Sequence, residues 1–344
     1  MPAMKILVTG CAGFIGFHLS RRLLAEGHTV MGIDNLNDYY DPALKKARLA
    51  QLGIDHTAVN DENLAIQDSS GRFTFVCIGI EDKAELDIYI GSERFDVVCH
   101  LAAQAGVRYS ITNPQAYITA NIQGFFNIAE SCRRNPVGRF VFASSSSVYG
   151  DNESIPYRES DPTDRPVSLY GATKKANEMM AYSLSRLYGI DTVALRFFTV
   201  YGPWGRPDMA PFLFTEAILE GRQIEVFNNG NLSRDFTYID DIIEGVYRVI
   251  MEEPATGDAY VNDDFRIYNI GNSQPVKLAD VITTIEDMAG QKAIKKYVPM
   301  QPGDVKDTWA DTTLLQQDFG YKPGTSLRHG LRKFIDWYRE FYSK

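Results

Sequence analysis

The chain of 344 residues is 44% hydrophobic and 23% charged, which is ordinary for an enzyme with a sizeable buried core. Its formal net charge of −9 argues against nucleic acid as the main partner, because proteins that bind phosphate backbones usually carry a basic excess. No apolar run approaches the ~18 residues of a membrane-spanning helix, and the four cysteines show no short paired spacing. We therefore expect a soluble cytoplasmic protein with no metal site, no disulfide and no membrane partner.

Apolar runs alternate with helical patterns through about the first 200 residues. The strand-like runs cover 5–8, 29–33, 97–101 and 140–143, and the first helical pattern covers 14–26. Such alternation predicts a doubly wound, Rossmann-type α/β fold, in which helices cover both faces of a parallel sheet.

The composition changes after the apolar run 192–198, where "GPWGRPDMAP" brings three prolines and two glycines. We expect a first domain over 1–198, to which the chain returns at about 235–273, and a smaller, interleaved α/β region over most of 199–344. The return is expected because 240–251 has the pattern of an amphipathic helix and 266–270 that of a short strand.

The stretch "ILVTGCAGFIG" places Gly10, Gly13 and Gly16 between a predicted strand and a predicted helix. Gly10 would allow a tight turn, Gly13 the close approach of the backbone to a pyrophosphate, and Gly16 the close packing of the helix on the strand. The helix N-terminus would then face the phosphates. We predict a dinucleotide-binding loop; the alternative is a chance glycine triplet in an ordinary loop.

The second predicted strand, "TVMGID", ends at Asp34, eighteen positions beyond Gly16. An acidic side chain at this place can accept hydrogen bonds from the hydroxyls of the adenosine ribose and repels a 2′-phosphate. The sequence therefore favours NAD over NADP as cofactor. The alternative is that Asp34 and Asn35 form a turn at the end of the strand.

Only one of the nineteen tyrosines, Tyr170, is followed by a lysine four positions later, in "YGATKKANEMMAYSL". On a helix these two positions share a face, so the Lys174 ammonium can sit beside the Tyr170 phenol and favour its phenolate. We expect this to lower the pKa of Tyr170 and to make it a general base for an alcohol that gives up a hydride. The alternative is an exposed Tyr-Lys pair.

Four serines follow the apolar run 140–142, in "ASSSSVYG". A serine-rich polar loop would explain them without a function. However, Ser145 precedes Tyr170 by twenty-five residues and stands where its hydroxyl could hydrogen-bond the reacting oxygen.

Together with further motifs, these residues make the chain resemble a known family over nearly its full length. It is similar to the extended short-chain dehydrogenases/reductases, and within them to the NAD-dependent nucleotide-sugar 4-epimerases, most closely the UDP-glucuronate 4-epimerases. The motifs that carry the resemblance are "TGCAGFIG", "DNLNDYYD", "HLAAQAGVRYS", "SSSSVYG", "YGATK", "RFFTVYGPWGRPDM", "RDFTYIDDI" and "QPGDV".

Two places separate this chain from other members of that family. Similar dehydratases carry two acids in the triplet before "VYG" and similar decarboxylases carry a final glutamate, whereas this chain has Ser145, Ser146 and Ser147. The resemblance therefore implies that these serines bind the sugar. The uronate epimerases have a threonine and, seven residues on, an arginine, which match Thr199 and Arg206; a planar guanidinium suits a carboxylate. The alternative is that Arg206 is a surface arginine in a loop.

The resemblance implies roles for further residues. Arg234 would bind the diphosphate, Phe227 would line the uracil pocket, and Asp304 belongs to the substrate site. Gly79 stands where relatives have an adenine-binding aspartate, so that contact differs here. The other residues implied to contact the cofactor are Phe14, Ile15, Asn35, Asn37, Ile80, Leu101, Ala102, Ala103 and Gln104.

The expected function is an isomerase that interconverts UDP-glucuronate and UDP-galacturonate through a transient 4-keto sugar, with NAD returned unchanged. A UDP-glucose or UDP-N-acetylhexosamine 4-epimerase, or one acting on an N-acetylated uronate, is the alternative; a decarboxylase, dehydratase or net dehydrogenase is less favoured. A non-catalytic dinucleotide sensor would not need Tyr170 and Lys174. The resemblance also implies a homodimer formed through helices near 114–132 and 169–188.

Overall fold

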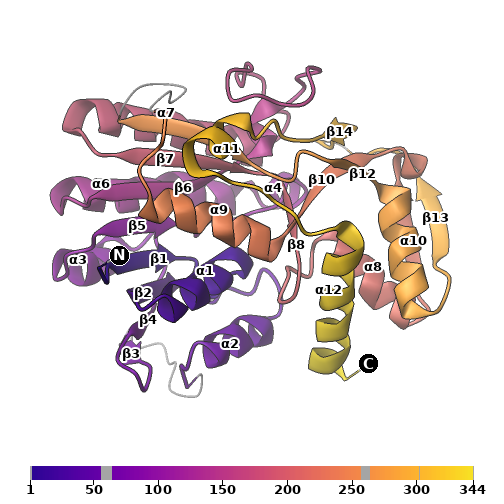
Figure 1. The fold of residues 1–344 in the computed structure, drawn as a ribbon, viewed down its shortest axis with the longest axis horizontal. Coiled ribbons are helices and arrows are strands. Elements are labelled where there is room, and N and C mark those ends of the chain that lie inside the picture. Colours follow the sequence, from indigo (N-terminus) through magenta and orange to yellow (C-terminus); the bar gives the residue numbers. More distant parts are fainter. Residues whose placement is uncertain (1, 56–63, 257–263, 302, 344) are drawn as a thin grey trace.

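A computed structural model describes residues 2–55, 64–256, 264–301 and 303–343, and within them the largest sheet has eight strands (Figure 1). Their order is β11-β7-β6-β5-β1-β2-β4-β3, and every neighbouring pair is parallel except β3 and β4. The strands are β1 (Lys5–Thr9), β2 (Thr29–Asp34), β3 (Ala65–Gln67), β4 (Phe73–Cys77), β5 (Val97–His100), β6 (Arg139–Ser145), β7 (Thr192–Phe197) and β11 (Phe265–Ile270). The strand order reverses at β1, and ligands of such sheets bind at this point.

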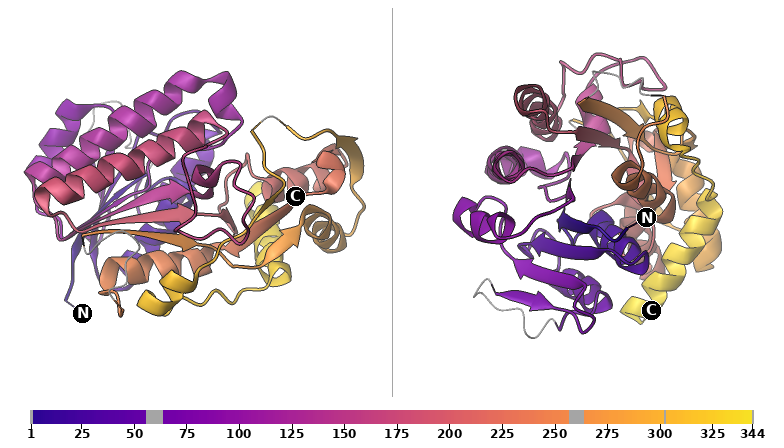
Figure 2. Two further views of the ribbon diagram at one scale, coloured as in Figure 1. Left: turned by 90° about the horizontal axis from the view of Figure 1, so that it is seen from above. Right: turned by 60° about the vertical axis from the view of Figure 1, so that its left-hand side comes forward.

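Helices cover both faces of the large sheet (Figure 2). Along β1, Ile6 and Val8 belong to one hydrophobic core and Leu7 to the other, because successive side chains of a strand point to opposite faces. The first face carries α1 (Phe14–Ala25), α2 (Pro42–Gln51), α9 (Ile239–Met251) and α11 (Thr313–Phe319), and the second carries α3 (Lys83–Gly91), α6 (Phe125–Arg134) and α7 (Leu169–Tyr188). The predicted doubly wound α/β fold is confirmed.

The rest of the chain builds a smaller region beside the carboxyl ends of the large sheet's strands (Figure 2). Here β10 (Ser233–Tyr238) pairs with β8 (Thr199–Tyr201), β12 (Pro275–Lys277) and β14 (Asp307–Thr308). A separate parallel pair joins β9 (Gln223–Phe227) to β13 (Ile294–Val298). Three helices pack around these strands: α8 (Ala210–Leu219), α10 (Leu278–Ala289) and α12 (Leu327–Tyr342).

The chain passes between the two regions several times. After β7 the chain leaves the large sheet, and β8, which begins at Thr199, is the first strand of the smaller region. Because β10 lies in the smaller sheet, the return to the large sheet begins with α9 at Ile239, a few residues after the expected position 235. The strand β11 then extends the large sheet beside β7.

A run of helical turns connects β5 to α6. It consists of α4 (Tyr109–Thr112), α5 (Pro114–Tyr117) and the π-helical segment η1 (Ile118–Gly124). Gly124 packs directly on Ile80, and a Cβ added at Gly124 would lie 2.6 Å from Ile80 Cγ1. Within η1, the Asn121 side chain accepts a hydrogen bond from Gln104 N at 2.8 Å and donates one to Gln104 O at 2.9 Å. The widened helix thus holds the loop that follows β5.

Within the described ranges, no helix is both long enough and apolar enough to cross a membrane. The same residues contain no group of three or more His, Cys, Asp or Glu side chains that could hold a metal ion.

Candidate active site

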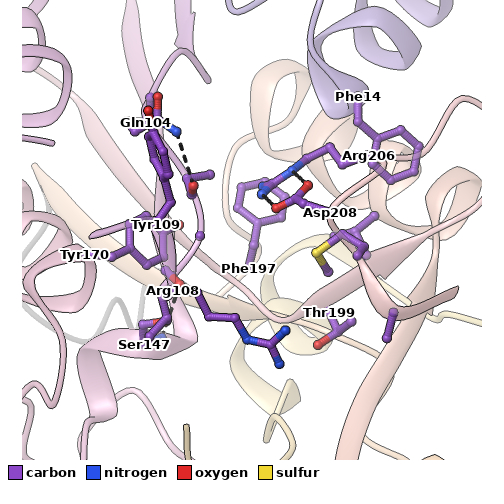
Figure 3. A pocket seen from close by; sticks show the side chains of 18 of the residues that line it. Phe14, Gln104, Arg108, Tyr109, Ser147, Tyr170, Phe197, Thr199, Arg206 and Asp208 are labelled. Carbon is purple, nitrogen blue, oxygen red and sulfur yellow. Dashed lines mark hydrogen bonds and ion pairs between the residues drawn. The ribbon is translucent and has the colours of Figure 1, made fainter. Parts of the chain in front are cut away.

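A pocket of about 970 Å³ lies between the carboxyl ends of the large sheet's strands and the smaller region (Figure 3). Every residue that the sequence analysis proposed for a site lines this pocket. On the side of the large sheet these are Gly10, Gly13, Phe14, Ile15, Gly16, Asp34, Asn35, Asn37, Ile80, Leu101, Ala102, Ala103, Gln104, Ser145, Ser146, Ser147, Tyr170 and Lys174. On the side of the smaller region they are Thr199, Arg206, Phe227, Arg234 and Asp304.

The glycine-rich loop is packed too closely for side chains. Gly10 has a φ of +73°, and a Cβ there would lie 2.8 Å from Ala102 N. A Cβ at Gly16 would lie 2.1 Å from Gly10 O, so the first turn of α1 rests directly on the loop. Gly13 precedes α1 and offers no side chain to cap it. The loop therefore presents backbone and the N-terminus of α1 to the pocket, as a pyrophosphate site requires.

Asp34 ends β2 at the edge of the same pocket. Its carboxylate accepts hydrogen bonds from Ala12 N at 3.2 Å and from Leu36 N at 2.9 Å. The bond to Leu36 is the turn contact that the alternative interpretation expected, and the bond to Ala12 ties Asp34 to the glycine-rich loop. Beyond it, the Lys45 ammonium donates to both Asn37 O and Asn37 Oδ1 at 2.8 Å and holds the following loop.

All four serines of the run line the pocket, but the Ser144 side chain is bonded to a neighbouring helix. Ser144 Oγ donates to Glu178 Oε1 at 2.7 Å, and Glu178 forms a buried ion pair with Arg196. This serine therefore anchors the end of β6 to α7. Ser145 Oγ accepts a hydrogen bond from Ser147 N at 3.1 Å and begins the short 3₁₀ helix η2 (Ser146–Tyr149). Ser145, Ser146 and Ser147 lie at the pocket wall beside Ser144.

Tyr170 lies in the first turn of α7, which Ser168 caps by accepting a hydrogen bond from Gly171 N at 3.0 Å. Burial raises the pKa of Tyr170, and a hydrogen bond with the Ser145 side chain acts in the opposite direction. Tyr170 and Ser145 therefore meet in the pocket, as the chemistry of a general base with a hydroxyl partner requires.

The expected effect of Lys174 on Tyr170 is wrong for this structure. The Lys174 ammonium donates to Ala143 O at 2.8 Å, on the end of β6. The pKa of Tyr170 is raised by burial, and the groups that oppose this rise are Ser145 and Arg206. Burial lowers the pKa of Lys174 to about 8. Helical spacing puts the two side chains on one face, but the carbonyl on the neighbouring strand decides where the ammonium points.

Arg206 is not a loose surface residue, since only 23% of its side chain is exposed. It forms a two-pronged ion pair with Asp208, in which Nε donates to Oδ1 at 3.0 Å and Nη2 to Oδ2 at 2.5 Å. Figure 3 shows this pair on the side of the pocket away from Tyr170, with Thr199 below it. Asp208 was not among the predicted site residues, although it stands two residues after Arg206 in the motif "RFFTVYGPWGRPDM".

Cationic side chains gather at the outer end of the pocket. Arg234 donates to Lys306 O at 2.8 Å and to Val305 O at 2.7 Å, and these bonds hold it against the chain before β14. Arg108 lies over the Phe227 ring, 4.6 Å from its centroid, and 3.6 Å from the Asp304 carboxylate. Arg108 was also missed, although the quoted motif "HLAAQAGVRYS" contains it.

Residues 6–271 match the family model of the NAD dependent epimerase/dehydratase family. The chain belongs to this family. It is 44% identical to a probable UDP-glucuronate 4-epimerase of Rhizobium meliloti (strain 1021), covering 99% of this chain and 98% of the relative. It is 46% identical to UDP-glucuronate 4-epimerase 4 of Arabidopsis thaliana, covering 99% of this chain and 76% of the relative.

A solved structure supports the same relationship. The UDP-glucuronic acid 4-epimerase of Bacillus cereus, in complex with UDP-glucuronic acid and NAD, superposes with a TM-score of 0.85 at 34% identity. The match covers 98% of this chain and 100% of that one. The resemblance inferred from the motifs is thereby confirmed.

Proposed function

We propose that this protein is an NAD-dependent 4-epimerase that interconverts UDP-glucuronate and UDP-galacturonate. One arrangement carries the proposal: Tyr170 and Ser145 meet on one side of a pocket whose other side presents Arg206 and Thr199. The first pair suits proton transfer at a sugar hydroxyl, and the second suits a sugar carboxylate. The relatives named as UDP-glucuronate 4-epimerases support this combination.

The residues of the large sheet fit NAD. The glycines at the start of α1 present backbone and the helix N-terminus to the pocket, which suits a pyrophosphate, and Asp34 presents a carboxylate to ribose hydroxyls at the end of β2. Beside them, Ile80, Leu101 and Gln104 line the same part of the pocket. Bound there, NAD would supply the reversible hydride transfer at carbon 4 of the sugar.

Tyr170 takes the proton of the sugar's 4-hydroxyl as that carbon is oxidised, and returns it when the carbon is reduced. The Ser145 hydroxyl hydrogen-bonds the same oxygen. Lys174 ties α7 to the end of β6 through Ala143 O, which keeps Tyr170 beside Ser145. Burial raises the pKa of Tyr170 and therefore disfavours the phenolate. The positive charge of Arg206 acts in the opposite direction and favours the phenolate.

The 4-keto sugar formed from a uronate is a β-keto acid, which loses carbon dioxide readily. Hydrogen bonds from Arg206, Thr199 and the serines Ser146 and Ser147 would stabilise its carboxylate. Decarboxylation disperses that charge into the ring, so these bonds raise its barrier. The serine triplet also lacks the acids of the dehydratase and decarboxylase patterns, which favours epimerisation.

The nucleotide must stay anchored while the sugar turns its other face toward the cofactor. Arg234 is fixed by the carbonyls of Val305 and Lys306, and we assign it to the diphosphate together with Arg108. Phe227, stacked under Arg108, lines the uracil side, and Asp304 orients both arginines. In this assignment the large sheet region binds NAD and the smaller region binds the nucleotide sugar.

We also propose that the active form is a cytoplasmic homodimer. The helices at 114–134 and α7 lie side by side and carry exposed apolar side chains. These are Ile118, Phe126, Met179, Tyr182, Leu187 and Tyr188. A second copy of the chain would cover this apolar surface.

The proposal is tested by incubating the purified protein with UDP-glucuronate, separating the sugar nucleotides and measuring carbon dioxide. The expected result is a mixture of UDP-glucuronate and UDP-galacturonate with neither carbon dioxide nor accumulated NADH. A UDP-pentose product would instead identify a decarboxylase, and steady accumulation of NADH would identify a net dehydrogenase.

A further inference from the structure

Two adjacent tyrosines lie in the loop that follows Asp34, within the motif "DNLNDYYD", and their hydroxyls bond different side chains. Tyr39 Oη donates to Asp208 Oδ2 at 3.0 Å. Tyr40 Oη accepts from Arg48 Nη1 at 2.7 Å. Neither phenol has a part in the reaction proposed above. Of these two hydroxyls, that of Tyr39 bonds the ion pair between Arg206 and Asp208, and that of Tyr40 does not.

The ion pair uses one edge of the Arg206 guanidinium. Nε and Nη2 each donate to Asp208, and this leaves the Nη1 edge for a ligand. A two-pronged bond fixes the plane of the group as well as its position. Without Asp208, the long Arg206 side chain would have to be ordered by the substrate itself, at a cost in rotamer entropy.

Asp208 is held in turn by Tyr39. The Tyr39 ring packs against Tyr109, with the ring centroids 4.7 Å apart. Gly106 approaches from the loop after β5, and a Cβ there would lie 3.0 Å from Tyr39 Oη. Burial raises the pKa of Tyr39 to about 12, and the nearby Asp208 acts in the same direction, so the phenol remains a donor at neutral pH.

The opposite charges of Arg206 and Asp208 also affect which sugars the site selects. Asp208 neutralises Arg206 before any sugar binds, so a sugar carboxylate meets oriented donors and not a bare cation. An uncharged hexose needs no such orientation, because it offers no carboxylate to the guanidinium. The effect of losing the orientation should therefore depend on the charge of the sugar.

We propose that Tyr39 and Asp208 are positioning residues for the sugar carboxylate: Asp208 sets the plane of the Arg206 guanidinium, and Tyr39 holds Asp208 in place. This inference rests on the proposed uronate specificity and names two residues that set it. It also assigns a role to Tyr39, the first tyrosine of "DNLNDYYD", in a loop whose other predicted site residues were assigned to the cofactor.

The test measures binding of UDP-glucuronate and UDP-glucose to the NAD-loaded enzyme by calorimetry, together with KM and kcat for both sugars at the pH optimum. Tyr39→Phe is expected to raise Kd and KM for UDP-glucuronate about fivefold, and Asp208→Asn roughly 20-fold. The values for UDP-glucose, and kcat for both sugars, should change less than about twofold.

Tyr40→Phe is the matched control, because it removes a neighbouring phenol hydroxyl whose partner, Arg48, keeps its bonds to the carbonyls of Ala12, Trp204 and Gly205. It is expected to behave as the wild type with both sugars. The NAD content of each variant, measured after release from the protein, separates a lost cofactor from a lost carboxylate contact.

Tighter binding of UDP-glucuronate to Asp208→Asn would overturn the inference, because Asp208 would then be a competitor of the sugar carboxylate. Equal losses for the two sugars in Tyr39→Phe would overturn it as well. The outcome for the wild type is separate: if the wild type neither binds nor epimerises UDP-glucuronate, the proposed function itself fails.

Discussion

The two sides of the pocket are built in different ways. On the side that we propose binds the cofactor, called the cofactor side, Gly10 and Gly16 are fixed by backbone atoms that leave no space for a Cβ. On the side that we propose binds the nucleotide sugar, called the sugar side, Arg206 and Arg234 are fixed by side-chain ion pairs and by carbonyls of neighbouring loops. Substitutions on the first side should therefore damage the fold and cofactor binding together, whereas those on the second should alter selectivity and leave the fold intact.

The largest effect is expected at Tyr170, the proposed general base. Tyr170→Phe removes the phenol oxygen that we propose accepts the sugar's proton as the phenolate, and kcat should fall about 1000-fold. Binding of UDP-glucuronate, measured by calorimetry on the NAD-loaded protein, should change little.

Tyr109→Phe is the control for this change, because Tyr109 also lines the pocket but its hydroxyl accepts from Asn113 Nδ2 at 2.7 Å. Its kcat should stay within about threefold of the wild type. An active Tyr170→Phe variant would remove the basis of the proposed chemistry.

The backbone-built side can be tested through stability. In Gly16→Ala the new methyl group would lie 2.1 Å from Gly10 O, so α1 must move away from β1. The free energy of unfolding should fall by roughly 3 kcal/mol, with a matching loss of NAD affinity. Urea denaturation and titration with NAD measure the two effects.

Gly91→Ala gives the contrast, since a Cβ at Gly91 meets nothing within 4 Å. Its stability should lie within about 1 kcal/mol of the wild type. If both variants unfold alike, the steric account of the loop is wrong.

The same contrast explains what could be predicted from the sequence. The glycine spacing, Asp34 at the end of β2 and Tyr170 at the start of α7 are local patterns, and local patterns can be read along the chain. Asp208 lies 169 residues from Tyr39, and only the fold brings them together. The direction of Lys174 was missed for the same reason, because its acceptor is on another element.

The sugar side can be tested through selectivity. Arg206→Ala removes the donors proposed for the sugar carboxylate and should lower kcat/KM for UDP-glucuronate about 100-fold. For UDP-glucose the loss should stay below about fivefold. Carbon dioxide release from UDP-glucuronate should also rise, because the 4-keto intermediate loses the bonds that hold its carboxylate. Equal losses for the two sugars would count against the uronate assignment.

The smallest expected effect lies in the pH dependence of Asp208→Asn, measured with UDP-glucose so that carboxylate binding does not contribute. The negative charge of Asp208 raises the pKa of Tyr170, and the positive charge of Arg206 lowers it. Removing the charge of Asp208 therefore favours the phenolate, and the rising limb of kcat against pH should move to lower pH. A move to higher pH would contradict the expected sign of this effect, and no move would mean that the charge of Asp208 does not act on Tyr170. The sugar side would then influence binding alone, and the reacting tyrosine would be governed entirely by the cofactor side.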